Sequence, residues 1–256
     1  MAEFIGAGVL TLVILNVQRS TIGVPYFVAT VAGLAAAVLV VAFGRTSGAQ
    51  LNPAITIALW TARKVGTLKA LSYVGAQLLG AWAAYYLYTY LVRNSFQPIG
   101  GHFSSRVLVA EAVGGMVLGL GWATAVYQQY VNSSRAALVG AAYMLAIIAA
   151  SAASIGLVNP AVALGARAWV WGTYVLGPVL GAVIGVNLYG LLFAPANSFA
   201  RLSRTASATT VTSARTESGT KLRATAPVPT LTTASAKTPK AKAVAKKKAN
   251  VAKKKK

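Results

Sequence analysis

The chain offers few side chains with which to do chemistry. It contains one His, three Glu, no Asp and no Cys. Disulfides, thiolate metal sites and cysteine nucleophiles are excluded, and acid–base or metal-assisted catalysis has almost no groups to use. The composition therefore argues against an enzyme, a bound metal or a cofactor.

A tripeptide that occurs twice is the most informative pattern. The copies are Asn52-Pro53-Ala54 and Asn159-Pro160-Ala161, 107 positions apart. Asn is a favoured helix N-cap and Pro favours the first helical position, so each copy predicts the start of a helix. The apolar segments at these places, near Leu51–Leu59 and Val158–Leu164, are too short to cross a bilayer. Each capping Asn would keep side-chain N–H groups that it can donate to another molecule. Two unrelated loop turns are the alternative, which the matching positions disfavour.

The acidic residues of the apolar part of the chain also stand at matching positions. Glu3 follows Ala2, and Glu111 follows Ala110, 108 positions later. A carboxylate within a membrane is a functional candidate by default, for example in a proton relay. Because no charged partner lies at helical spacing, we expect a structural role instead.

Charge and hydropathy divide the chain into two parts. The net charge is +21 although 56% of the residues are hydrophobic and only 11% are charged, against about 25% charged in a soluble domain. Residues 197–256 hold 15 Lys and Arg and one Glu, so most of the charge lies there. The preceding residues are an apolar body.

Membrane spans account for that body, since a spanning helix needs about 20 mostly apolar residues. Six stretches qualify, roughly Glu3–Val17, Tyr26–Phe43, Ala70–Leu91, Val107–Tyr127, Ala136–Ile155 and Ala168–Phe193. Basic residues between spans two and three and between spans four and five, with those of 197–256, mark the cytoplasmic side. Six spans then place both termini in the cytoplasm.

The second half of the body repeats the first. Tyr73-Val74 recurs as Tyr174-Val175, in the same order relative to the Asn-Pro-Ala copies. Each copy holds three spans, an odd number, so the second copy must be inverted in the membrane. Inverted repeats with interrupted helices place a permeation path near the bilayer midplane. The two half-helix N-termini that meet there carry partial positive charge and would repel cations. We expect half-repeats at residues 1–100 and 101–196.

These motifs resemble those of the aquaporins, the major intrinsic protein family. The resemblance covers about residues 2–195 and rests on the string Ser-Gly-Ala-Gln-Leu-Asn-Pro-Ala at 47–54, on the second Asn-Pro-Ala and on the paired Glu residues. It implies an all-α membrane protein with six transmembrane helices, two re-entrant half-helices and an inverted repeat. It also implies a passive channel for water or small neutral solutes, and a homotetramer with one pore per subunit. In this family the two Glu residues brace the half-helix loops by accepting backbone N–H bonds.

The chain departs from the family pattern at two places. Gln50 stands where the family usually has His, and Val162 stands where the family usually has the Arg of its selectivity filter. Arg167 matches a second, structural Arg of the family. An Arg167 side chain that swings into the pore is the alternative.

Carried over by spacing, the filter consists of four small or apolar residues, Ala32, Ile147, Gly156 and Val162. Such a constriction would be wider than that of a water-selective member, apolar and without fixed charge. We therefore expect a channel for neutral solutes such as glycerol or urea, and for water. The alternative is a water-selective or non-conducting relative that serves adhesion or scaffolding.

The basic region 197–256 is rich in Ser, Thr, Ala and Lys and has few large apolar residues, which predicts a disordered cytoplasmic tail. Anionic lipid is one partner that it could bind, at roughly 1 kcal/mol per basic residue near the surface. Its resemblance to linker-histone tails makes nucleic acid a second.

Overall fold

The computed structural model describes residues 1–20, 24–95, 97–99 and 102–194, which form helices and loops without a strand. The predicted tail, 197–256, lies outside the described residues. The elements are α1 (Ala2–Gln18), α2 (Pro25–Phe43), α3 (Pro53–Thr61), α4 (Thr67–Val92), α5 (Ser105–Tyr127), α6 (Asn132–Ala150), α7 (Pro160–Gly165), the π-helical turn η1 (Trp171–Val175) and α8 (Leu176–Phe193).

The predicted helical order is confirmed, with α3 and α7 as the two short helices, but several predicted boundaries were wrong by three to five residues. The third span begins at Thr67 rather than Ala70, and the fifth at Asn132 rather than Ala136. The fifth span ends at Ala150 rather than Ile155. Beyond Ala150 the chain forms a turn in which Ser154 N donates to Ala150 O at 3.0 Å. It then passes through Gly156 with a φ of 67°, and the next two backbone N–H groups donate to Glu111. The sixth span begins at Trp171 rather than Ala168, since Ala168 instead closes the end of α7 by donating its N–H to Ala163 O.

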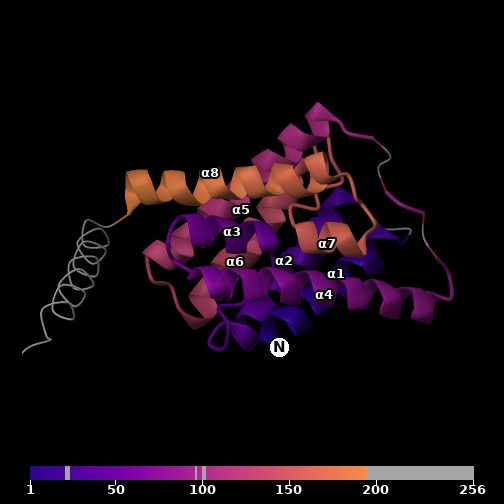
Figure 1. The fold of residues 1–256 in the computed structure, drawn as a ribbon, viewed down its shortest axis with the longest axis horizontal. Helices are drawn as coiled ribbons and strands as arrows, with labels where there is room; N and C mark the ends of the chain where they lie inside the picture. Colours follow the sequence, from indigo (N-terminus) through magenta and orange to yellow (C-terminus); the bar gives the residue numbers. More distant parts are fainter. Residues whose placement is uncertain (21–23, 96, 100–101, 195–256) are drawn as a thin grey trace, which may run out of the picture. The chain divides into compact units, whose positions relative to one another are not determined.

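The helices of the two halves pack in a reciprocal pattern. Within each half the first long helix packs on the last, α1 on α4 and α5 on α8. Across the halves α2 packs on α6, α3 on α8, and α7 on α4. Figure 1 shows the short helices α3 and α7 between α8 and α4. This exchange of partners is the packing that a pseudo-two-fold relation between inverted repeats requires.

Glycine permits the closest helix contacts. At the α2–α6 crossing, a Cβ added to Gly33 would lie 2.7 Å from Gly140 O, and one added to Gly140 would lie 2.6 Å from Gly33 O. At the α5–α8 crossing, a Cβ on Gly181 would lie 1.9 Å from Ala112 O. Small residues let membrane helices approach until their backbones touch, so these positions fix the crossings.

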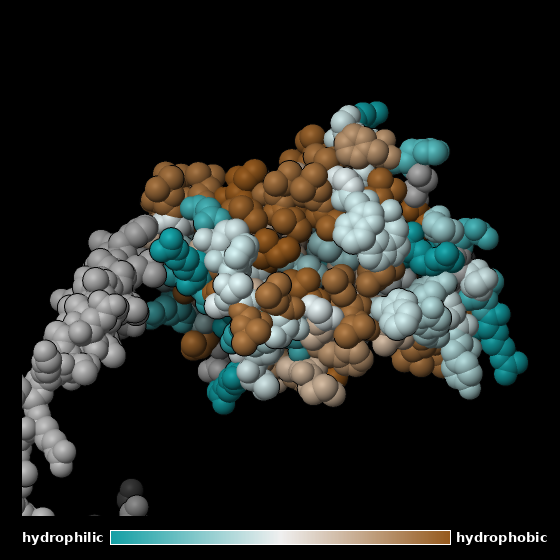
Figure 2. Space-filling model, in the orientation of Figure 1, coloured by the Kyte–Doolittle hydropathy of each residue, from teal (hydrophilic) through white to brown (hydrophobic). Residues whose placement is uncertain are grey.

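The surface is that of a membrane protein. Among the described helices, α2, α5, α6 from Ser133 onward, and η1 with α8 are long and apolar enough to cross a bilayer, while α1 is a shorter apolar helix. At 26 residues α4 is the longest helix, about 39 Å at 1.5 Å per residue. Figure 2 shows hydrophobic side chains over the face formed by α8, where Leu180, Ile184 and Leu191 are exposed.

Candidate functional site

The two Asn-Pro-Ala copies begin the two short helices. Asn52 is the N-cap of α3 and its side-chain oxygen accepts the N–H of Ala54 at 2.9 Å. Asn159 is the N-cap of α7 and its oxygen accepts the N–H of Ala161 at 2.9 Å. In both helices Pro occupies the first position, where its missing N–H and fixed φ cost nothing.

The two caps are joined across the halves by reciprocal hydrogen bonds. The Asn52 Nδ2 donates to Val158 O at 3.0 Å, and the Asn159 Nδ2 donates to Leu51 O at 3.0 Å. Each Asn therefore bonds to the carbonyl that directly precedes the other Asn. The N-termini of α3 and α7 meet at this junction, and both Asn side chains are almost completely buried.

The carbonyls reach across because their residues adopt a left-handed backbone. Leu51 has a φ of 54° and Val158 a φ of 46°. This conformation is uncommon outside glycine and especially unfavourable for a β-branched residue such as Val. Surrounding contacts must hold such residues in place.

Glu3 supplies those contacts in the first half. Its Oε1 accepts from Ser47 Oγ at 2.6 Å and from Gln50 N at 3.0 Å, and its Oε2 accepts from Leu51 N at 2.7 Å and Gln77 Nε2 at 2.8 Å. One carboxylate thus satisfies four donors around the loop that leads into α3. Such charge-assisted bonds are about twice as strong as neutral ones.

Glu111 repeats the arrangement in the second half. Its Oε1 accepts from the Ser154 hydroxyl and from Leu157 N at 3.0 Å, while its Oε2 accepts from Val158 N at 2.7 Å. Sequence reasoning selected the two Glu residues, quoted Ser47 only as part of the motif at 47–54 without a role, and missed Ser154. Ser47 and Ser154 stand 107 positions apart, the same offset as the Asn-Pro-Ala copies, and that signal could have identified them.

The C-terminal ends of the short helices are also alike. Arg63 follows α3 with a φ of 56°, and Arg167 follows α7 with a φ of 59°. In each case the N–H of the next residue donates to the carbonyl five residues earlier, Lys64 N to Leu59 O and Ala168 N to Ala163 O. This hydrogen bond is typical of a Schellman motif. The guanidinium of Arg167 lies 5.8 Å from the ring centroid of Tyr85 in α4.

Lys64 follows α3 and lies outside the spanning segments. Its surroundings shift the pKa of its amino group. Its Nζ lies 4.0 Å from the ring centroid of Tyr127. Partial burial lowers the pKa of Lys64 below the ordinary lysine value.

The four predicted filter residues lie in the buried interior. Ile147 and Gly156 are in direct contact, since a Cβ on Gly156 would lie 2.9 Å from Ile147 O. Ala32 and Val162 belong with Ile147 to one buried cluster, and each of these three side chains is 1% exposed or less. Val162 lies in the first turn of α7, where its N–H is 3.4 Å from the Asn159 side-chain oxygen.

Two polar side chains beside the junction carry unused hydrogen-bonding capacity. Gln50 is buried, and its Oε1 has no hydrogen-bond partner among the described residues. Tyr143 of α6, which sequence reasoning missed, is buried and its hydroxyl accepts the Asn159 Nδ2 at 2.9 Å. A tyrosine within an apolar helix carries no sequence signal for this contact.

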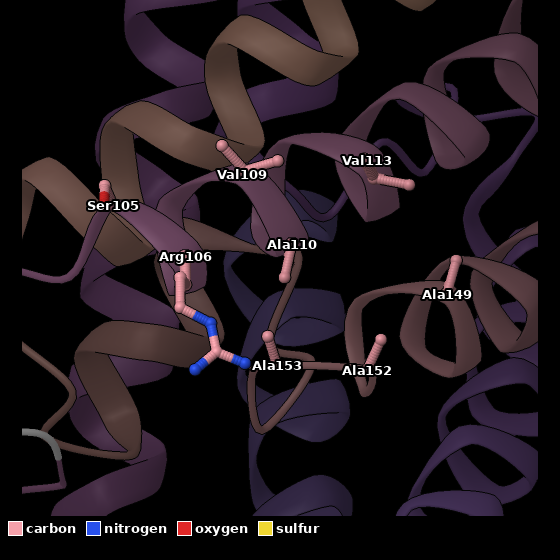
Figure 3. A pocket seen from close by; sticks show the side chains of 8 residues that line it. All are labelled: Ser105, Arg106, Val109, Ala110, Val113, Ala149, Ala152 and Ala153. Atoms are coloured by element: carbon pink, nitrogen blue, oxygen red, sulfur yellow. The ribbon is translucent and has the colours of Figure 1, made fainter.

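A cavity elsewhere on the surface contains none of the predicted site residues. It has a volume of about 520 Å³ and lies between the start of α5 and the turn after α6. Figure 3 shows its wall of Ala and Val side chains, with Arg106 at one side. Within the described ranges, His, Asp and Glu form no cluster of three or more that could hold a metal.

The paired half-helices and their braced loops agree with a comparison to known families. The profile described as major intrinsic protein matches residues 1–189. The chain belongs to the major intrinsic protein family. Membership confirms the predicted helical membrane fold and the prediction that the chain is not an enzyme, because the family consists of passive channels.

Individual family members are moderately similar. Aquaporin NIP1-1 of Zea mays is 33% identical over 184 residues, which cover 64% of this chain and 62% of that protein. Aquaporin NIP3-1 of Zea mays is 31% identical over 209 residues, or 73% of this chain and 68% of that protein. The chain thus spans less than two thirds of the length of NIP1-1.

A solved structure has the same fold. The aquaglyceroporin from Plasmodium falciparum superposes with a TM-score of 0.64 at 22% identity, covering 76% of this chain and 95% of that one. Together with the apolar helices, family membership establishes an integral, multi-pass membrane protein.

Proposed function

We propose that the chain forms a passive membrane channel for small neutral solutes, such as glycerol or urea, and for water. The observation that carries the proposal is the junction at which Asn52 and Asn159 cap two half-helices and bond to each other's preceding carbonyl. Such a junction directs two helix N-termini and their side-chain amides at one point inside the membrane. Amide donors there can replace part of a solute's hydration shell.

The proposed filter favours neutral solutes over ions. Its members, Ala32, Ile147, Gly156 and Val162, carry no charge and no side-chain donor. An apolar wall lowers the cost of admitting the alkyl face of a polyol but offers a bare ion nothing to replace its water. The partial positive charges of the helix N-termini add a barrier to cations.

Gln50 supplies a hydrogen-bond acceptor beside the proposed permeation path. Its unpartnered Oε1 lies in the braced loop directly before Leu51 and Asn52. A solute with N–H or O–H groups can donate to it and then accept from an amide of the junction. Water, urea and polyols all carry both kinds of group.

The proposal is tested by reconstitution into liposomes and by swelling in isosmotic gradients of glycerol and urea. Solute-driven swelling above that of empty liposomes is expected. Water flux without solute flux would reject the neutral-solute assignment, and the absence of both would reject the channel.

A water-selective or non-conducting relative is the second candidate, and one observation favours it. The side chains of Ala32 and Val162 are small, yet both are 0% exposed, so neighbouring atoms close the space around them. In this reading the protein would serve adhesion or scaffolding. The same swelling measurements separate the two candidates.

The assembly and its basic region complete the proposal. Four copies form a tetramer with one pore each, both termini lie in the cytoplasm, and residues 1–100 and 101–196 are the two inverted half-repeats. Residues 197–256 bind anionic lipid through their 15 basic residues, with nucleic acid as the alternative partner. Native mass measurement in detergent tests the tetramer.

A further inference from the structure

The hydroxyl of Tyr143 alters the hydrogen bonds available at the junction. An amide nitrogen of Asn has two hydrogens. For Asn159 both are used, one by Leu51 O at 3.0 Å and one by Tyr143 Oη at 2.9 Å. Among the described residues Asn52 finds a partner for only one, Val158 O. The two caps are therefore not equivalent toward a solute.

The Tyr143 hydroxyl retains a hydrogen of its own. It accepts from Asn159, and no acceptor for its O–H is found within the described part of the chain. Its side chain is 3% exposed. A buried hydroxyl normally satisfies its donor, so this O–H is available to a ligand at the junction.

The position of Tyr143 on α6 places its ring on the proposed path. Residues four apart lie on the same helix face, and Tyr143 is four residues before the filter residue Ile147. Gly140, three residues before Tyr143, touches Gly33 of α2, so α2 and α6 are in backbone contact within one turn of the ring. The ring is also the largest side chain among the residues named at the junction and the filter.

On these observations, and resting on the proposed channel function, we infer that Tyr143 is a specificity-determining residue at the centre of the path. Its ring sets the width there, and its hydroxyl takes the place of Asn159 as a donor. A permeating oxygen atom then binds the free amide hydrogen of Asn52 and the hydroxyl hydrogen of Tyr143. Compact solutes with acceptor oxygens, such as water and urea, fit this pair, while the three-carbon polyol glycerol is slowed by the ring.

The test measures the ratio of glycerol to water permeability in liposomes for the wild type, Tyr143→Val and Tyr143→Phe. The ratio does not depend on how much folded protein is reconstituted. Tyr143→Val removes the ring, and the ratio should rise by about tenfold, the low end of the discrimination that one methylene gives in an apolar pocket. Tyr143→Phe keeps the ring and should keep a ratio close to that of the wild type. Tyr90→Val is the matched control, because Tyr90 is 80% exposed on α4.

The outcomes separate this inference from the proposed function. A wild type that conducts, with an unchanged ratio in Tyr143→Val, overturns the role of Tyr143 and leaves the channel intact. An equal rise in Tyr143→Phe overturns the assignment of the width to the ring. A wild type without water or solute flux rejects the channel, and the inference that rests on it falls with it.

Discussion

Replacing Glu3 by Gln removes the charge of the first-half brace while keeping its shape. The carboxylate accepts two donors on each oxygen, and one donor of each pair is a backbone N–H, that of Gln50 on Oε1 and that of Leu51 on Oε2. A Gln amide has a single acceptor oxygen, and its NH₂ group faces the second pair. The side chain of Gln77 can rotate to offer its own oxygen, and the Ser47 hydroxyl can accept, but a backbone N–H cannot adapt.

Either orientation of the new amide therefore leaves one buried backbone N–H without an acceptor. An unsatisfied buried donor costs about 1–3 kcal/mol. For a protein of this size each kcal/mol shifts the unfolding midpoint by about 2–4 °C, so Glu3→Gln should lower Tm by roughly 2–12 °C. Glu3→Ala leaves all four donors without acceptors and should lower it further.

Thermal unfolding in detergent, followed by tryptophan fluorescence, measures the effect. Glu111→Gln is the parallel variant. The Glu111 carboxylate accepts Leu157 N and Val158 N on different oxygens, so the substitution would again leave one backbone N–H without an acceptor. A Tm equal to that of the wild type in both Glu3→Gln and Glu3→Ala would show that the carboxylate does not hold the loop.

Three further predictions concern the filter, the helix crossing and the basic region. Val162→Arg should reduce glycerol flux by about tenfold relative to water, because a guanidinium fills an apolar constriction; equal effects on both fluxes in swelling assays would remove Val162 from the filter. Gly33→Ala should cost about 1–3 kcal/mol by overpacking against Gly140 O at 2.7 Å. Gly75→Ala, where a Cβ meets nothing within 4 Å, should stabilise α4 by about 0.5–1 kcal/mol; urea unfolding midpoints compare the two. Deleting residues 197–256 should abolish cosedimentation with acidic liposomes, and undiminished binding would reject the lipid assignment.

Much of the site follows from local sequence. Asn before Pro predicts where α3 and α7 begin, because capping depends only on adjacent residues. The offset shared by the Asn-Pro-Ala copies predicts paired half-helices, and the spacing of Glu3 and Glu111 predicts paired supports. Helix ends were less predictable. The segment after α6 bonds to a distant carboxylate, since Leu157 N and Val158 N donate to Glu111, and no local pattern specifies that partner.

The sequence by itself determined an apolar helical body, a basic region after it, two capped half-helices and their duplication, since periodicity, capping and composition act over a few residues. Only the tertiary structure decided what each cap faces. The bonds from Asn52 to Val158 and from Asn159 to Leu51 join residues more than 100 positions apart. The contact of Tyr143 with Asn159 joins α6 to the N-cap of α7. Capping and periodicity act within one helix, so only the packing of these two helices brings a tyrosine hydroxyl to one cap and not to the other.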